Sequence, residues 1–281
     1  MDGINRLFVT ESRNQSSLNR LLTESPFSLV DLDQARLKVL SSLPETQLKH
    51  TGVQSVDDTL LVHYGEHFDQ IAKLLDPTTE SYVWAHNLVN LHYSDDATDY
   101  PARFQLWKPT DVAALEQGLR AAGFELKASK EILKTAAPHK WRNYLQGLWR
   151  RHQDQPEVAA LYQSKLIIAE HLLQTWVTAY PTPKLPVTFD NWYTQPGFCR
   201  YVDKTLHLAY VGTLAESDQV LLKRGAQRLD QFAAHLKEEH FRIISGNSTG
   251  DPDFINIQYT PRKTQHHKEP PIVDMCLPAW V

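Results

Sequence analysis

GVQSVDDT, at residues 52–59, is a short strand-like run that ends in Asp57, Asp58 and Thr59. A second run, LPVTFDNWY at residues 185–193, carries Asp190 directly after its apolar part. A buried strand that stops on a carboxylate puts that group at the rim of a sheet, where two neighbouring strand ends can share a divalent metal. Taken singly, each Asp is more often a turn residue or a helix N-cap. Together, the two stretches predict a carboxylate site suited to phosphodiester chemistry.

Two further β-rich runs lie between these stretches, YVWAHNLVNLH at residues 82–92 and YPARFQLW at residues 100–107. Helical patterns follow, over residues 111–124 from an Asp111 cap and over residues 161–179. Three strands, then helices, then a fourth strand ending in Asp is the order of an RNase H-like core. We therefore expect an α/β fold, with an RNase H-like mixed sheet flanked by helices and an irregular C-terminal tail.

This ordered series of motifs resembles that of bacterial insertion-sequence DDE transposases. The motifs are DDT at residues 57–59, HNLV at 86–89, YP at 100–101 and FDNWY at 189–193. Upstream, QSSLNRLLTES at residues 15–25 resembles the short helical segment that precedes the first Asp in that family. The resemblance runs from about Gly3 to about Leu214.

The resemblance implies metal-dependent cleavage and transfer of DNA strands, with Asp57 and Asp190 as catalytic residues and ligands of Mg²⁺ (or Mn²⁺). Asp57 is preferred to Asp58 because strand alternation points Asp58 to the other side, and because the family's acid stands two residues before Thr or Ser. The implied partner is double-stranded DNA at transposon ends, with a homodimer as the candidate assembly.

The family uses a third acid, a Glu on a helix well after the second Asp. None of the later glutamates has that setting: Glu216, Glu238, Glu239 and Glu269. The amino-terminal DNA-binding segment of the family has no counterpart either. We therefore expect a copy truncated at both ends, whose activity depends on whether a third acid exists. The expected division is a helical segment over 1–50, the RNase H-like core over 51–240 and an irregular, truncated tail over 241–281.

Charge is unevenly distributed along the chain, although the net charge is only −4. Residues 53–119 hold 11 acids and 3 bases, a net −8, and residues 120–152 hold 8 bases and 2 acids, a net +6. An acidic centre beside a basic flank fits metal binding next to phosphate binding. The DNA-binding candidates are Lys140, Arg142, Arg150 and Arg151. A solvated helix face is the alternative, and the interleaved aromatics, such as Trp141, are expected in the core.

Composition sets the outer limits. The chain has 281 residues, of which 42% are hydrophobic and 22% charged, as in ordinary globular proteins. Cys199 and Cys276 show no metal or disulfide spacing, so we expect a reducing compartment. No run approaches 18 apolar residues and no leader pattern opens the chain. The expected location is cytoplasmic and nucleoid-associated, without a membrane partner.

Two other function classes remain open. A non-catalytic DNA-binding or regulatory remnant of a transposase would bind duplex DNA independently of Asp57 and Asp190, with a steep dependence on salt. A stand-alone metal-dependent hydrolase would lose Mn²⁺-dependent turnover on substitution of Asp190. Zinc binding by His86 and His92, six residues apart on one strand, has no third ligand at a matching spacing, so structural roles are favoured for both.

Overall fold

The computed structural model describes residues 28–235, apart from Glu66, Glu216, Lys223 and Arg224, together with the strands 254–259 and 273–278 and the isolated residues Arg20, Glu24 and Pro26. The chain divides into two compact units, residues 1–48 and residues 49–281. Most of the segment at residues 15–25 lies outside the described residues, as do Glu216, Glu238, Glu239 and Glu269.

The first unit contains helix α3, Leu29–Ser42, followed by the short 3-10 turn η1, Pro44–Thr46. Ser28 is the N-cap of α3, and its hydroxyl accepts a hydrogen bond from the Asp31 backbone N–H. The Asp31 carboxylate in turn accepts from the Ser28 backbone N–H at 2.7 Å. This reciprocal capping box satisfies backbone donors that the first helical turn leaves unpaired.

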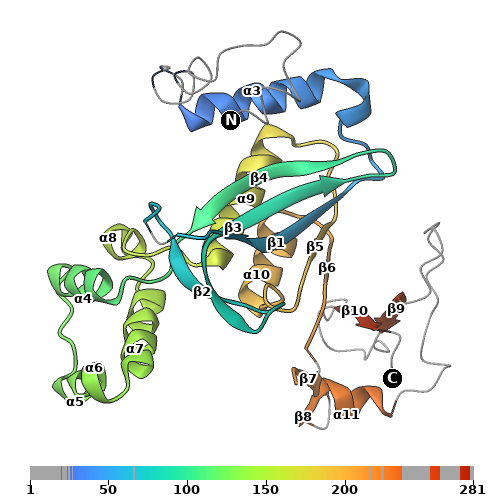
Figure 1. Ribbon diagram of the computed structural model, residues 1–281. Helices are drawn as coiled ribbons and strands as arrows, with labels where there is room; N and C mark the ends of the chain where they lie inside the picture. The colour runs from blue at the N-terminus through green and yellow to red at the C-terminus, as the bar shows by residue number, and fades with distance from the viewer. Residues whose placement is uncertain are drawn as a thin grey trace. The chain divides into compact units, whose positions relative to one another are not determined.

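The second unit is built on a six-stranded mixed sheet (Figure 1). Its strands are β1 Val53–Val62, β2 Ala72–Asp76, β3 Ser81–Ser94, β4 Asp99–Trp107, β5 Val187–Phe189 and β6 Tyr210–Gly212. Strand β1 pairs antiparallel with β3, and β3 pairs antiparallel with both β2 and β4 on its other side. On the opposite edge of β1, strands β5 and β6 follow in parallel. The expected α/β class with a mixed sheet and flanking helices is thus confirmed.

Alternation along β3 explains which face of the sheet is covered. Its buried residues are every second one, Ala85, Asn87, Val89, Leu91 and Tyr93. Successive side chains in a strand point to opposite faces, so these residues share one face. Helix α9, Lys165–Ala179, packs against β3 and β4 with its buried residues Ile168, Ala169, Leu172, Leu173 and Trp176.

A group of helices separates β4 from α9 in the sequence, and Figure 1 shows it beside the sheet. It comprises α4 Val112–Ala121, α5 Ala128–Glu131, α6 Leu133–Ala136, α7 Pro138–Arg151 and α8 Pro156–Ala159. These helices enclose a core of their own that includes Leu115, Leu119, Trp141, Leu145 and Trp149. Asp111 caps α4 as predicted, and Gly123 follows the helix with φ of +87°, where only Gly is unstrained.

After β5, the described chain forms α10 Pro196–Arg200, the π-helical turn η2 Tyr201–Thr205 and β6. A hairpin of β7 Gln219–Leu222 and β8 Gly225–Arg228 precedes α11 Leu229–Ala233. The segment for which an irregular tail was expected contains two antiparallel strands, β9 Phe254–Tyr259 and β10 Val273–Pro278.

Candidate functional site

The acids of the DDT motif lie inside β1 and not at its end. We expected the strand to end in Asp57, Asp58 and Thr59, but β1 continues to Val62 because β3 pairs with it along its whole length. Strand β5 is much shorter and ends at Phe189, which lies opposite Val56. Beyond Val56, therefore, β1 has no β5 neighbour. Asp57 is the first residue of β1 past the end of β5.

Asp190 follows Phe189 at once, so the parallel register brings it level with Asp57. Both residues are exposed. The Asp190 carboxylate accepts hydrogen bonds from the backbone N–H groups of Trp192 at 3.1 Å and Tyr193 at 3.3 Å. Asp190 therefore also stabilises the turn that follows β5, which is the common role of an Asp directly after a strand.

The pKa of the Asp57 carboxyl is raised above its usual value, chiefly because surrounding atoms displace part of its hydration. The negative charges of Asp190 and Asp58 raise this pKa further, while the Asp58 backbone N–H and Lys165 lower it. The influence of the Asp190 charge on Asp57 agrees with the parallel register that brings the two residues level. A divalent cation in that environment would relieve the repulsion.

Asp58 faces the covered side of the sheet and is tied into a polar network. Its Oδ2 accepts from Asn87 Nδ2 at 2.7 Å and forms an ion pair with Lys165 Nζ at 2.7 Å. The Tyr193 hydroxyl lies 3.4 Å from its Oδ1. Asp57 and Asp58 therefore differ as alternation predicts: Asp57 is exposed, and Asp58 is engaged by other side chains.

Tyr193 links the three acids. It is fully buried, and burial raises the pKa of its phenol strongly. The charges of Asp58, Asp57 and Asp190, in decreasing order, raise this pKa as well. The charges of all three carboxylates therefore act on one phenol, although Asp57 and Asp58 belong to β1 and Asp190 follows β5.

Lys165 stands at the first position of α9, after the N-cap Ser164. Its ammonium group lies 4.8 Å from the ring centre of Trp107 and 5.3 Å from that of Trp192. Sequence reasoning missed Lys165, Asn87 and Tyr193 as parts of this site. One signal was present: a Lys in the first turn of a helix opposes the helix dipole and suggests a specific partner.

The proposed DNA-binding residues are all exposed, on α7. Lys140, Arg142, Arg150 and Arg151 form no ion pair with any residue that the structure describes. The opposite side of α7 is packed, and Trp141, Leu145 and Trp149 are buried as predicted. Two other bases of the flank are already neutralised, because Arg120 and Lys134 pair with Glu116 at 3.2 and 2.6 Å.

The histidines of β3 have local roles. His86 Nδ1 is 2.8 Å from His63 Nε2, and His86 Nε2 is 2.6 Å from the Asp69 carbonyl. Within the described part of the chain, no group of three or more His, Cys, Asp or Glu side chains is arranged to hold a metal ion. The expected Mg²⁺ site of Asp57 and Asp190 would accordingly need water or substrate oxygens as its remaining ligands.

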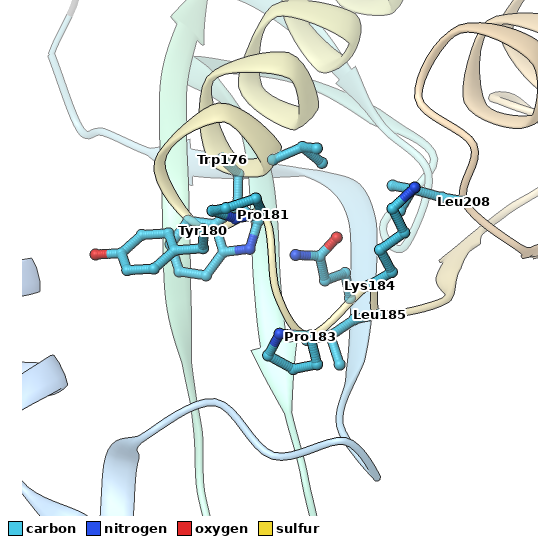
Figure 2. Close-up of a pocket in the computed structure, with 9 residues that line it drawn as sticks. Trp176, Tyr180, Pro181, Pro183, Lys184, Leu185 and Leu208 are labelled. Carbon is cyan, nitrogen blue, oxygen red and sulfur yellow. The ribbon is translucent and has the colours of Figure 1, made fainter.

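A shallow pocket lies at the other end of the β1–β5 pair (Figure 2). Its lining includes Trp176, Tyr180, Pro183, Leu185 and Leu208, with the buried Gln54 behind them. Gln54 precedes Asp57 by three positions, which corresponds to about 10 Å along a strand. The pocket is therefore separate from the acids.

Comparison with known proteins finds no matching family model, no matching curated protein and no matching solved structure. Of the helices that the structure describes, none combines the length and the apolar composition needed to span a bilayer.

Proposed function

We propose that this chain is a metal-dependent enzyme of DNA strand cleavage and transfer, with an RNase H-like core of the DDE transposase type. The observation that carries the proposal is the parallel pairing of β1 with β5, which brings Asp190 level with Asp57 at the point where β5 ends. Two carboxylates that lie level on adjacent parallel strands, where one of the strands ends, are well placed to share a ligand.

The sheet supports the proposed fold. Four antiparallel strands, the long β1, β3 and β4 and the five-residue β2, come before α4, helices follow, and a short strand that leads into an acid then pairs with β1. Apart from the additional short strand β2, this is the order of an RNase H-like core. Asp57 lies on β1, the central strand of the sheet, so its position is fixed by strand pairing and not by a loop.

The reaction that we assign to Asp57 and Asp190 is a displacement at a phosphodiester. Asp57 and Asp190 present hard carboxylate oxygens, which are the ligands that Mg²⁺ and Mn²⁺ prefer. Bound there, the ion would activate water or a 3′-hydroxyl and stabilise the leaving oxygen. Asp57 is exposed and carries a raised pKa, so a cation gains more from it than from the paired Asp58.

DNA would be held by the exposed bases of α7. Lys140, Arg142, Arg150 and Arg151 have no competing acid among the described residues. Free guanidinium and ammonium groups bind phosphates without regard to sequence, and the affinity falls as salt rises. The buried aromatic side of the helix keeps these bases on its outer side.

The test is nicking of supercoiled DNA in Mn²⁺ or Mg²⁺. The wild-type chain should nick the plasmid, and Asp57→Asn and Asp190→Asn should each reduce the rate by at least about 100-fold, since removing a metal ligand removes most of the charge stabilisation. Glu157→Ala, at an exposed acid of α8, is the control and should leave the rate unchanged. Equal nicking by all four proteins would refute the assignment.

A non-catalytic DNA-binding role is the second candidate, and the engaged state of Asp58 together with the exposed bases of α7 favours it. It predicts salt-dependent duplex binding that survives both Asp57→Asn and Asp190→Asn, with no nicking by the wild-type chain. The same plasmid assay, combined with a filter-binding assay, distinguishes the two candidates.

A further inference from the structure

The outer side of α7 carries a regular series of residues. Side chains three or four positions apart are neighbours on one side of a helix. In α7 this spacing links four residues into one row, which we call the α7 stripe: Lys140, Asn143, Gly147 and Arg151. All of them except Gly147 are exposed. The helix contains no Asp or Glu, so the charges that it contributes itself are all basic.

The polar side chains of α7 differ between its packed side and the stripe. On the packed side, Trp141 Nε1 donates a hydrogen bond to Glu116 at 3.2 Å, and Gln146 Nε2 donates one to Thr110 at 2.7 Å. On the stripe, no described residue forms a hydrogen bond or an ion pair with the side chain of Asn143, nor with those of the two bases. These groups can therefore bind an external ligand without first breaking a contact.

Gly147 leaves the middle of the stripe bare. Glycine inside a helix is less stable than Ala, and in α4 the packing explains it, because a Cβ on Gly118 would collide with Leu161. No such reason exists for Gly147, where a Cβ would meet only the Arg151 guanidinium, at 3.6 Å. Glycine also serves where a ligand approaches the backbone closely. The bare centre of a basic stripe suits that use.

The α7 stripe has the length and the chemistry to fit the major groove of duplex DNA. Lys140 and Arg151 are about three helical turns apart, or about 16 Å along the axis. The groove is about 12 Å wide and admits an α-helix. Long basic side chains at the two ends can therefore reach the phosphates that border the groove, while Asn143 and Gly147 face the base edges. The amide of Asn pairs in bidentate fashion with adenine.

We propose that α7 is a recognition helix that enters the major groove of duplex DNA, with Asn143 contacting a base and Gly147 at the closest approach. The inference rests on the DNA-binding part of the proposed function and deepens it. Phosphate contacts position a protein on DNA but carry no sequence information, whereas contacts to base edges do. Lys140 and Arg151 accordingly set the affinity, and Asn143 sets a sequence preference.

The experiment is selection of duplexes from a random-sequence pool by the full chain in EDTA, with sequencing of the bound fraction. The wild type should enrich a short motif. Asn143→Ala should lose the preference at one base pair and bind the enriched duplex about 5- to 150-fold more weakly, with an unchanged salt slope. Lys140→Ala should keep the motif and lower the slope of log K against log salt by about 1. Gln117→Ala, at an exposed amide of α4, is the matched control and should change neither.

No enriched motif with the wild type, or an unaltered motif with Asn143→Ala, would overturn the inference. Gly147→Leu tests the close approach separately. It should leave thermal stability equal or higher, because Leu favours a helix over Gly and a Cβ there has no steric conflict. It should nevertheless weaken binding of the enriched duplex as much as Asn143→Ala does, since the side chain holds the helix away from the bases. Wild-type affinity in this variant would contradict the proposed approach.

Duplex RNA distinguishes groove entry from attraction by charge alone. The major groove of A-form RNA is deep and too narrow for side chains to read. The wild type should therefore bind the enriched DNA duplex at least about tenfold more tightly than an RNA duplex of the same sequence at equal salt. Equal affinities would show that the stripe contacts phosphates only, which would overturn the inference.

The outcome is separable from that of the proposed catalysis, because binding in EDTA requires neither a metal ion nor Asp57 and Asp190. A motif that depends on Asn143, found together with no plasmid nicking, would support the recognition helix and refute the catalytic assignment. Nicking without any motif would refute the recognition helix alone.

Discussion

At the scale of single residues, two adjacent acids of one strand have opposite surroundings. Asp58 is neutralised by Lys165 and hydrogen-bonded by Asn87. Asp57 is exposed, and its pKa is raised by reduced hydration and then by the charge of Asp190. A carboxylate that is costly to ionise in the folded state is one that gains from a cation. The surroundings of the two acids therefore support the proposal that Asp57, and not Asp58, binds the metal ion.

Asp57→Asn should stabilise the fold at pH 7 in the absence of metal. Because the folded pKa lies above the usual value of 3.8, the ionised carboxyl destabilises the folded state above that pKa, and this effect vanishes as the pH falls below 3.8. The gain should be below about 1 kcal/mol, since the side chain is exposed and screened. Urea unfolding at pH 7 and pH 3.5 measures it, and a loss of stability at pH 7 would contradict the account.

Asp76→Asn is the matched control for that experiment. Hydrogen bonds from the Thr78 backbone N–H and then the Thr79 hydroxyl lower the pKa of Asp76. Its ionised form therefore stabilises the fold above pH 3.8, and this contribution is lost as the pH falls through the lowered pKa. Asp76→Asn should accordingly destabilise at pH 7, the opposite sign to Asp57→Asn.

At the scale of elements, α4 and α7 differ in whether packing accounts for an interior glycine. Each helix has a glycine in its interior, which costs about 1 kcal/mol relative to Ala in an open helix. In α4, a Cβ on Gly118 would collide with the Leu161 side chain. In α7, a Cβ on Gly147 would meet only the Arg151 guanidinium, at 3.6 Å. The two glycines therefore have different reasons to be there.

Gly118→Ala should destabilise the protein by about 1 kcal/mol, since overpacking outweighs the gain in helix propensity. Gly147→Ala should stabilise it by up to about 1 kcal/mol, because no steric conflict opposes the gain in helix propensity. Thermal unfolding of the two variants against the wild type provides the measurement. Shifts of the same sign in both would show that the Leu161 side chain does not decide the outcome.

The exposed side of α7 makes a separate prediction about DNA. Arg142→Ala with Arg150→Ala should weaken duplex binding and lower the slope of log K against log salt by about 1 for each phosphate that is no longer neutralised. Stability should stay within about 0.5 kcal/mol, because both side chains are at the surface. Arg120→Ala, at an arginine paired with Glu116 and Glu131, is the control and should leave the slope unchanged.

At the scale of the whole molecule, the sheet could be predicted from the sequence and the network around Asp58 could not. The long strands β3 and β4 have alternating or β-branched patterns, and α4 has an Asp111 cap and a terminal Gly123, so local chemistry identifies them. Strands β2 and β8 are only five and four residues long and carry no such signal. Ser28 and Asp31 have the same preference for the N-cap of α3, so the sequence alone does not choose between them.

The contacts of the site depend on tertiary structure. Lys165 reaches Asp58 across 107 residues, and Tyr193 reaches it across 135. No local pattern encodes such a meeting, because it depends on how α9 and the turn after β5 pack on β1. The predicted end of β1 was wrong for the same reason: its continuation to Val62 depends on β3, a partner that the strand's own residues do not specify.

The central claim is that Asp57 and Asp190 share a divalent cation, and the most direct measurement is a crystal structure of the full chain grown in Mn²⁺, with anomalous diffraction locating the ion. The account predicts an anomalous peak in contact with carboxylate oxygens of both residues, and its loss in Asp190→Asn. Well-ordered Asp57 and Asp190 carboxylates that turn away from each other at saturating Mn²⁺, with no peak between them, would contradict it.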